Sequence, residues 1–237
     1  MSTFGVIAEF IHGPYHLWFL YSLAGLYLLT PILRKTAADG KTLAYFLIMF
    51  AAVNVVTQYL IYVPKIGGMI SDFIERTGLR AVTGYMGYFM LGYFLYSKKD
   101  NMSKKTETAI YVIGILMLIA TIAAECFISE ELRKTDFVKQ YMKPNVILYS
   151  AAIYTFFVMK MSKIHYSERT RKVFAVFTEC GFGVYCIHAI LNGFVPTPVI
   201  KSLPLITSLL RVACLYALSL ALTWLIRKIP FVGKKIT

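Results

Sequence analysis

The sequence predicts an all-α protein, a polytopic membrane helix bundle with about seven transmembrane helices. Of its 237 residues, 58% are hydrophobic and only 16% are charged, against about 25% charged residues in soluble domains. Its mean hydropathy is +0.63. Apolar runs of about 17 to 25 residues, the length that crosses a bilayer as a helix, recur along the whole chain. We therefore expect a single integral-membrane domain over residues 1–237.

Seven apolar runs are the expected spans. The third is short and rich in glycine, with Gly84, Gly87 and Gly92, which would let neighbouring helices approach closely. The expected spans are Leu17–Leu33, Thr42–Val63, Ala81–Tyr96, Thr108–Ile128, Asn145–Met161, Val173–Val195 and Leu205–Ile226.

The basic residues predict the orientation of these spans. The net charge of +13 does not indicate nucleic-acid binding, because the lysines and arginines lie in short blocks between apolar runs, where they set topology and contact anionic lipid. Sixteen of the 25 follow the first, third and fifth runs or lie in the C-terminus, which we therefore expect to be cytoplasmic, in a cell (plasma) membrane. They are Arg34, Lys35, Lys41, Lys98, Lys99, Lys104, Lys105, Lys160, Lys163, Arg169, Arg171, Lys172, Arg227, Lys228, Lys234 and Lys235.

Two histidines are the leading candidates for chemistry. His16 precedes Trp18 at the mouth of the first run, and His188 lies well inside the sixth, three residues after Tyr185. Both are expected near the same membrane surface, where imidazoles in a wet cavity can bind a polar substrate and exchange protons. The alternative is that His16 is an ordinary interfacial residue and His188 a histidine hydrogen-bonded to a neighbouring hydroxyl in the core.

Other polar residues inside the spans are less conspicuous. Glu179 is nine residues before His188 and faces the other way on the same helix, so Arg171 and Lys172 are its candidate partners. Arg211 lies two turns into the seventh run, where it can snorkel or pair with an acid. The four cysteines have neither metal-ligand nor redox spacing, and we expect no metal. The nucleotide, zinc-protease and serine-hydrolase motifs of soluble enzymes are absent.

Five stretches, in order, resemble the acyltransferase family 3 membrane proteins. The most specific parts are HLWF at residues 16–19 and GVYCIH at residues 183–188. The stretches are GPYHLWFLYSLAGLYLLTPILRK (13–35), GYFMLGYFLY (87–96), YMKPNVILYSAAIYTFF (141–157), CGFGVYCIHAIL (180–191) and IRKIPFVGKKI (226–236).

The resemblance implies transfer of an acyl group, often acetyl, from cytoplasmic acyl-CoA to a hydroxyl of a surface or envelope polysaccharide. Family members typically have about ten spans, and this chain resembles the last seven. The catalytic histidine and arginine pair of the family's first helices are not found here, and Glu179 and Cys180 stand where the family often has serine. We therefore expect little activity from the chain by itself, with N-terminal helices missing or supplied by a partner subunit.

The leading hypothesis is thus a membrane acyltransferase with acyl-CoA as donor and a saccharide as acceptor. The catalytic base is unassigned among His16, His188 and Tyr185. We expect Trp18, Tyr21, Glu179 and Arg211 in the substrate cavity, and Arg169, Arg171 and Lys172 at the phosphates of CoA. A secondary transporter or flippase for lipid-linked sugars, and a non-catalytic membrane subunit, are the alternatives.

The topology can be tested by cysteine accessibility. In a background without native cysteines, Ser103→Cys should be protected from a membrane-impermeant thiol reagent in intact cells and labelled after lysis, because the loop 97–107 is expected in the cytoplasm. Labelling of this position in intact cells would reverse the proposed orientation.

Overall fold

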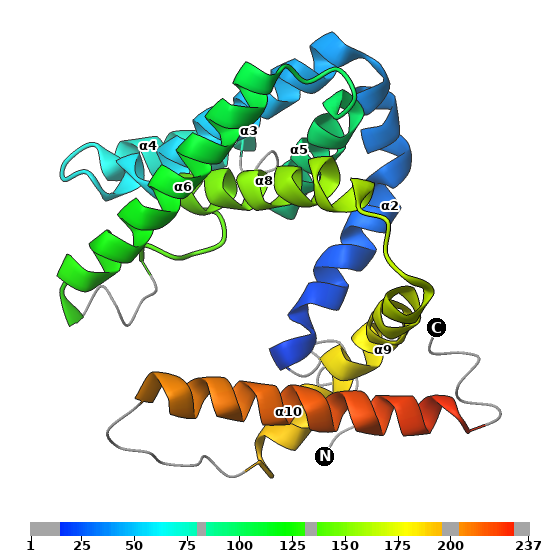
Figure 1. Cartoon of the computed structure of the whole chain (residues 1–237). Helices are drawn as coiled ribbons and strands as arrows, with labels where there is room; N and C mark the ends of the chain where they lie inside the picture. Colours follow the sequence, from blue (N-terminus) through cyan, green and yellow to red (C-terminus); the bar gives the residue numbers. More distant parts are fainter. Residues whose placement is uncertain (1–14, 80–83, 131–136, 196–203, 230–237) are drawn as a thin grey trace, which may run out of the picture. The chain divides into compact units, whose positions relative to one another are not determined.

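All regular structure in the described part of the chain is helical, which confirms the all-α prediction (Figure 1). The computed structural model describes residues 15–79, 84–130, 137–195 and 204–229. The elements are η1 (Tyr15–Leu17), α2 (Trp18–Ala38), α3 (Gly40–Gln58), η2 (Leu60–Tyr62), α4 (Gly67–Arg76), α5 (Tyr85–Lys98), α6 (Lys104–Phe127), α8 (Pro144–Met159), η4 (Met161–Lys163), α9 (Glu168–Asn192) and α10 (Pro204–Arg227).

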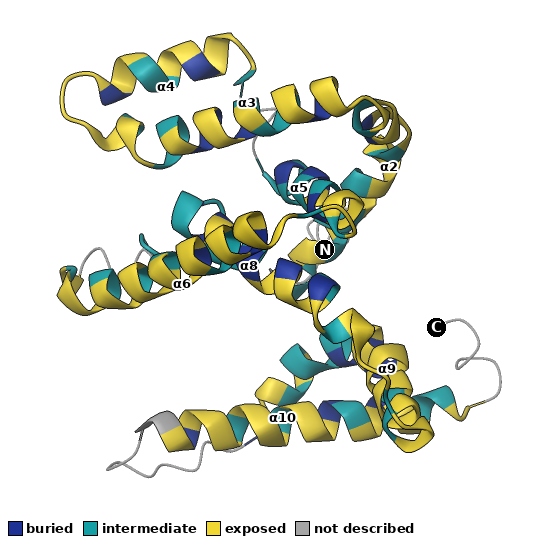
Figure 2. Cartoon of the chain, turned by 45° about the horizontal axis from the view of Figure 1, so that its top comes forward, coloured by how far each residue is buried: buried dark blue, intermediate teal, exposed yellow. Residues whose placement is uncertain are grey.

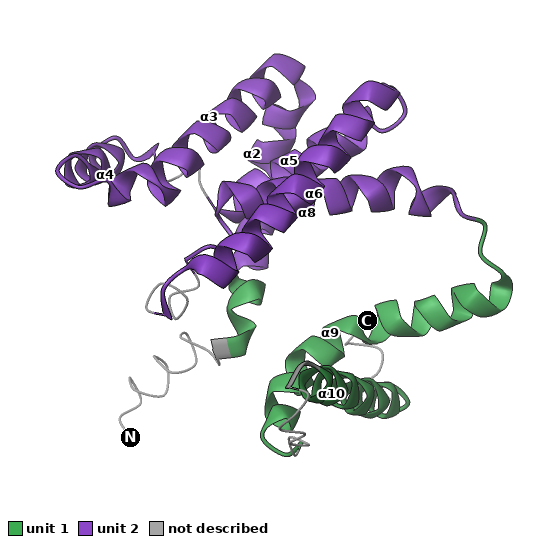
Figure 3. Ribbon diagram, turned by 60° about the vertical axis from the view of Figure 1, so that its left-hand side comes forward, with its two compact units in different colours: residues 1–21, 165–237 green, residues 22–164 purple. Residues whose placement is uncertain are grey.

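The helices form two compact units (Figure 3). Unit 1 comprises residues 1–21 and 165–237, and unit 2 comprises residues 22–164. Helix α2 begins in unit 1 and continues into unit 2 from Ser22.

Five helical segments in the described residues are long and apolar enough to cross a membrane, so the expected number of seven is not confirmed. They are Gly40–Tyr62, Lys104–Phe127, Pro144–Lys163, Glu168–Asn192 and Ile206–Arg227. The expected first span forms α2, whose 21 residues suffice in length, but Pro31, the tyrosines and the Arg34-Lys35 pair make it less apolar. The first three residues of the expected third span, 81–83, lie outside the described residues. The described part forms α5, whose 14 residues reach about 21 Å, less than the ~30 Å hydrocarbon core.

Polar side chains cap three of the helices and explain where they begin. Asp39 accepts hydrogen bonds from the backbone N–H groups of Lys41 and Thr42 at the start of α3. The hydroxyls of Ser103 and Ser167 accept from the backbone three residues later at the starts of α6 and α9. The bonds from the side chain and backbone of Thr42, and from the backbone of Lys41, lower the pKa of Asp39. The capped helices α6 and α9 therefore begin earlier in the chain than the fourth and sixth expected spans.

Helix α8 is the hub of unit 2. It packs against α6, α5 and α3, while α3 also contacts α5. Leu33, Leu43 and Met90, from α2, α3 and α5, form a small buried cluster. Helices α3 and α5 meet closely, because a Cβ on Gly87 would lie 2.0 Å from the ring of Phe50. This agrees with the expectation that glycine in this segment permits close helix packing.

One further helix of unit 2, α4, was not anticipated from the sequence. Its ten residues, GGMISDFIER, lie between the second and third expected spans and contact η2. A Cβ on Gly67 would lie 1.9 Å from the carbonyl oxygen of Ile61, so glycine is required where α4 folds back on η2. The helix is too short to span. It carries Ile70 and Ile74 one turn apart together with the exposed charged residues Asp72, Glu75 and Arg76, which is typical of an interfacial helix.

Unit 1 is built on the antiparallel pair α9 and α10. The two helices touch at Gly183 and Thr223, both buried, where an added Cβ on Gly183 would lie 2.3 Å from Cγ2 of Thr223. Arg211 lies beside the end of α9 and Arg227 beside its middle, which fixes the register of the pair. A small residue facing a hydroxyl residue is the usual form of a tight contact between membrane helices.

The distribution of side chains supports membrane insertion. Large apolar residues cover the outside of the long helices, including Leu28 at 82% exposure and Phe127 at 90%, and Figure 2 shows exposed residues over most of α6, α9 and α10. Polar residues such as Asn54, Thr155 and Ser219 are buried instead and bond carbonyls one turn earlier. An apolar exterior of this extent is expected for a surface covered by lipid.

The helix contact in unit 1 gives a stability prediction with a matched control. Gly183→Ala should lower the stability of the chain in detergent by about 1–3 kcal/mol, because the new methyl group overlaps Thr223. Gly181→Ala on the same helix meets no atom within 4 Å and should be neutral or stabilising, since alanine favours helix. Thermal unfolding of the two variants measures the difference, and equal midpoints would contradict the packing.

Candidate functional site

The two histidines singled out from the sequence lie together in unit 1. The ring centroids of His16, on η1, and His188, on α9, are 5.9 Å apart and the rings meet edge to face at 85°. Both side chains are half-buried. The expected proximity of the two rings agrees with the structure, whereas their part in catalysis stays a prediction.

Hydrogen bonds to backbone carbonyls hold this pair in place. The hydroxyl of Tyr185 donates to the carbonyl oxygen of His16, which ties the start of the described chain to α9. Nδ1 of His188 lies 2.6 Å from the carbonyl oxygen of Tyr185, one turn earlier on the same helix. A carbonyl only accepts, so Nδ1 carries the proton, and in the neutral ring Nε2 has a free lone pair. The tautomer is thereby fixed.

Aromatic rings surround the histidine pair. The ring of Tyr185 is 5.9 Å from that of His188 and 6.1 Å from that of Phe19, on the first turn of α2. Trp18 lies on the same turn of α2 with its ring 6.1 Å from that of Phe19, and Tyr21, 51% exposed, presents more of its surface to the outside. The site therefore combines two ring nitrogens with an aromatic wall, which suits a hydroxyl-bearing ligand.

The structure does not bring Glu179 to the histidine pair. Its carboxylate forms an ion pair of 2.7 Å with Arg227, at the end of α10, rather than with Arg171 or Lys172. The same guanidinium lies 3.7 Å from Sγ of the fully buried Cys180. Nine residues of helix separate Glu179 from His188, about 13 Å along the axis. No sequence pattern predicted this partner, since Arg227 is 48 positions away.

Arg211 lies nearer to the histidine end of α9. Its guanidinium donates to the side-chain oxygen of Asn192 at 3.2 Å and to the carbonyl oxygen of Asn192 at 3.4 Å. Asn192 is the last residue of α9, one turn beyond His188. A cation at a helix C-terminus is favoured by the helix dipole, so this contact supports the end of α9.

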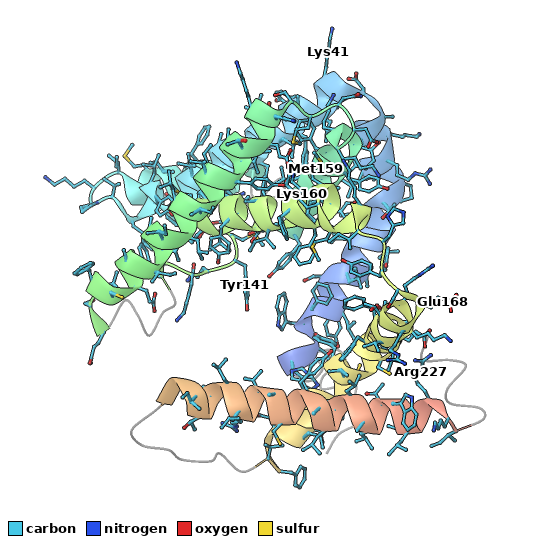
Figure 4. The ribbon with its side chains drawn as sticks, in the orientation of Figure 1. Lys41, Tyr141, Met159, Lys160, Glu168 and Arg227 are labelled. Carbon is cyan, nitrogen blue, oxygen red and sulfur yellow. The ribbon has the colours of Figure 1, made fainter. Side chains whose placement is uncertain are left out.

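The three basic residues expected to bind CoA lie on the first two turns of α9. Arg169, Arg171 and Lys172 are all exposed. Arg169 and Lys172 line a shallow hollow of about 560 Å³, together with Glu168, Val173 and Val176. Figure 4 labels Glu168 at this end of the helix. Exposed guanidinium and ammonium groups at a helix N-terminus are suited to phosphate, and no group of acidic, histidine and cysteine side chains in the described ranges is arranged to hold a metal.

A buried lysine in unit 2 escaped the sequence interpretation. The side chain of Lys143, which precedes α8, is fully buried, and its ammonium donates to the carbonyl oxygen of Gln58 at 2.6 Å. It lies 3.9 Å from the ring centroid of Phe137 and 4.7 Å from that of Tyr59. Burial lowers the pKa of Lys143. The arrangement fastens the chain before α8 to the end of α3 by cation–π contacts.

Tyrosines also line a hollow of about 590 Å³ between α5 and α8 in unit 2. Its hydroxyl-bearing residues are Tyr88, Tyr93, Tyr96, Ser150 and Tyr154. From the sequence, only close helix packing at the glycines was predicted for this segment. Tyrosine at the observed spacing is also typical of a membrane interface, so the pattern alone did not distinguish a hollow from a lipid-facing belt.

Comparison with known proteins decides the family. The family model described as an acyltransferase domain, that of acyltransferase family 3, matches residues 2–228. The chain belongs to acyltransferase family 3. No curated protein and no solved structure matches it.

As a member of acyltransferase family 3 with five apolar helices of spanning length, the chain is a membrane protein with a membrane-acyltransferase domain. The match extends over residues of both compact units. The expectation of a single domain over residues 1–237 stays a prediction. The family assignment gives the histidine pair its chemical context, because acyl transfer to a hydroxyl requires a group that accepts a proton.

The proximity of the two histidines can be measured without any activity. In a background without native cysteines, His16→Cys combined with His188→Cys should be joined efficiently by a short bifunctional thiol reagent, because the two rings are in contact. His16→Cys combined with Glu179→Cys should react poorly, since Glu179 lies about 13 Å further along α9. Protease cleavage between the two positions followed by gel electrophoresis distinguishes linked from unlinked chains. Equal cross-linking of both pairs would contradict the site.

Proposed function

We propose that this protein transfers an acyl group, typically acetyl, from acyl-CoA to a hydroxyl of a cell-surface or envelope polysaccharide. It would act in the plasma membrane with its C-terminus in the cytoplasm. Membership of acyltransferase family 3 supports the reaction class. The observation that carries the proposal is the contact of Nδ1 of His188 with the carbonyl oxygen of Tyr185, which makes Nε2 the accepting nitrogen, beside the ring of His16 in a half-buried aromatic site.

The proposed chemistry uses the imidazoles on the acceptor hydroxyl. Nε2 of His188 accepts a hydrogen bond from that hydroxyl, and the proton leaves to an imidazole as the oxygen attacks the thioester carbonyl carbon. The C–S bond then breaks, and the CoA thiolate takes up the proton. Tyr185 is a positioning residue, since its hydroxyl is engaged with the carbonyl of His16.

The donor would be held by the basic hollow at the start of α9. Arg169 and Lys172 line it and Arg171 lies on the same two turns, so three cations are available to the phosphates of CoA. The positive end of the helix dipole adds to this attraction. Such a site would recognise the phosphates of the donor by their charge. It would not select the acyl group, which other contacts would have to recognise.

The decisive test is turnover in cells that produce the natural gene product. His188→Ala should lower acylation of the envelope polysaccharide by about ten- to a hundredfold, the scale expected for a group that positions or polarises the hydroxyl. The loss should be partial, because His16 stays in the site. Ester-linked acyl groups released by mild base and counted per protein molecule give the measurement.

His165→Ala is the matched control. His165 is exposed in the segment between η4 and α9 and should keep full turnover. Protein abundance is followed by immunoblot, so that loss of turnover is separated from loss of protein. Wild-type turnover in His188→Ala would reduce His188 to a structural role, and absence of any acyl transfer dependent on the wild-type protein would refute the proposed function.

A further inference from the structure

An apolar groove runs between α6 and α8 on the surface of unit 2. Its volume is about 590 Å³. Small residues make its floor, because a Cβ on Gly114 would lie 2.2 Å from Cβ of Ala152. Large side chains from both helices form its walls, and several of them, such as Ile115, Ile153 and Phe157, are about half-exposed. The lining consists of Tyr111, Gly114, Ile115, Leu118, Tyr149, Ala152, Ile153, Phe156, Phe157 and Lys160.

One end of the groove is polar. Lys160, just beyond the end of α8 (Figure 4), forms a 2.8 Å ion pair with Glu107, a residue in the first turn of α6. The hydroxyl of Tyr111 donates to the same carboxylate at 3.0 Å. The carboxylate side chain is only 11% exposed, whereas that of Lys160 is 54% exposed. The charge of Glu107 is thereby compensated within the protein.

Two further lysines give this end a surplus of positive charge. Lys163, the last residue of η4, acts electrostatically on the carboxylate of Glu107. Lys104 is three residues before Glu107, on the same face of α6, and is exposed. Against one carboxylate stand three ammonium groups, so the mouth of the groove attracts an anion.

The length of the groove suits one leaflet of a bilayer. From Tyr111 at the polar end to Leu118 is seven residues, about 10 Å along α6. Half of the hydrocarbon core is about 15 Å. A lipid chain entering beside the lysines would thus lie against the groove for most of one leaflet. The charge distribution predicts that this is the cytoplasmic leaflet, where anionic lipids attract basic segments.

We propose that this groove binds one anionic phospholipid, with an acyl chain along Gly114 and Ala152 and its phosphate beside Lys104, Lys160 and Lys163. Charge complementarity favours this occupant. A zwitterionic lipid has no net charge, and neither it nor an apolar helix of a second copy would bring a net negative charge to compensate the surplus ammonium groups. The inference is independent of the acyl-transfer proposal, since it uses neither the histidine pair nor the basic hollow of α9.

The test compares lipid retention in nanodiscs made from equal parts of phosphatidylglycerol and phosphatidylcholine. The full chain should release from the disc with phosphatidylglycerol attached in preference to phosphatidylcholine, as counted by native mass spectrometry. Lys163→Gln and Lys104→Gln should each lower the retained phosphatidylglycerol by about fivefold, the effect of one lysine at a membrane surface. Lys65→Gln, an exposed lysine that follows η2, is the control for the same change of charge.

A second pair of variants tests the apolar part of the groove. Ile153→Trp places a larger ring in the groove from an exposed position and should reduce retention of both lipids. Ile119→Trp, at a similarly exposed position on α6 outside the groove lining, should change nothing. Circular dichroism verifies that each variant stays helical.

Several outcomes would overturn the inference. They are equal retention of the two lipids by the wild type, retention unchanged in Ile153→Trp, or the same loss in Lys65→Gln as in Lys163→Gln. Displacement of the lipid by millimolar inorganic phosphate would indicate a simple anion site. A change in oligomeric state in Ile153→Trp without loss of lipid would indicate a second copy of the chain in the groove.

Discussion

Close approach of helices at glycine is the constraint on which both units depend. Within a bilayer, apolar side chains gain nothing by leaving lipid for one another, so helices associate where small residues let their backbones touch. Gly183 meets Thr223 in unit 1, and Gly114 meets Ala152 in unit 2. The first contact sets α9 against α10, and α9 carries His188. The second makes the floor of the groove between α6 and α8. The two candidate binding features therefore follow from the packing itself.

The second constraint is that polar groups within the helices need partners. Buried hydroxyls bond carbonyls one turn earlier, and Nδ1 of His188 does the same with the carbonyl of Tyr185. For a hydroxyl this bond only satisfies the group. For an imidazole it also selects the tautomer and leaves Nε2 able to accept a proton, so a local backbone contact prepares the ring for chemistry. The neighbouring ring of His16 then provides a second nitrogen at the same place.

How much the sequence could predict depends on the range of the interaction. Helix class and the proximity of His16 to His188 followed from apolar run length, from the two histidines' common membrane level and from family resemblance. The partner of Glu179 did not, because Arg227 is brought to it only by the pairing of α9 with α10. The cation–π contacts of Lys143 were not predicted either, because Phe137 and Tyr59 belong to separate segments of the chain. The number of spans is not confirmed at two places, namely at α2, which contains Pro31 and the Arg34-Lys35 pair, and at α5, which has 14 described residues.

Charge pairing within the helices connects topology to lipid. Each of Glu107 and Glu179 lies within a helix of spanning length and is paired with a cation near the C-terminal end of a neighbouring helix, Lys160 and Arg227 respectively. A carboxylate next to hydrocarbon is costly without such a partner. With these two acids paired, exposed lysines and arginines such as Lys104, Lys163 and Arg171 still lie near the helix ends. The basic residues that predict the orientation of the chain are thus also groups that can attract anionic ligands, whether the phosphates of a lipid or those of an acyl-CoA.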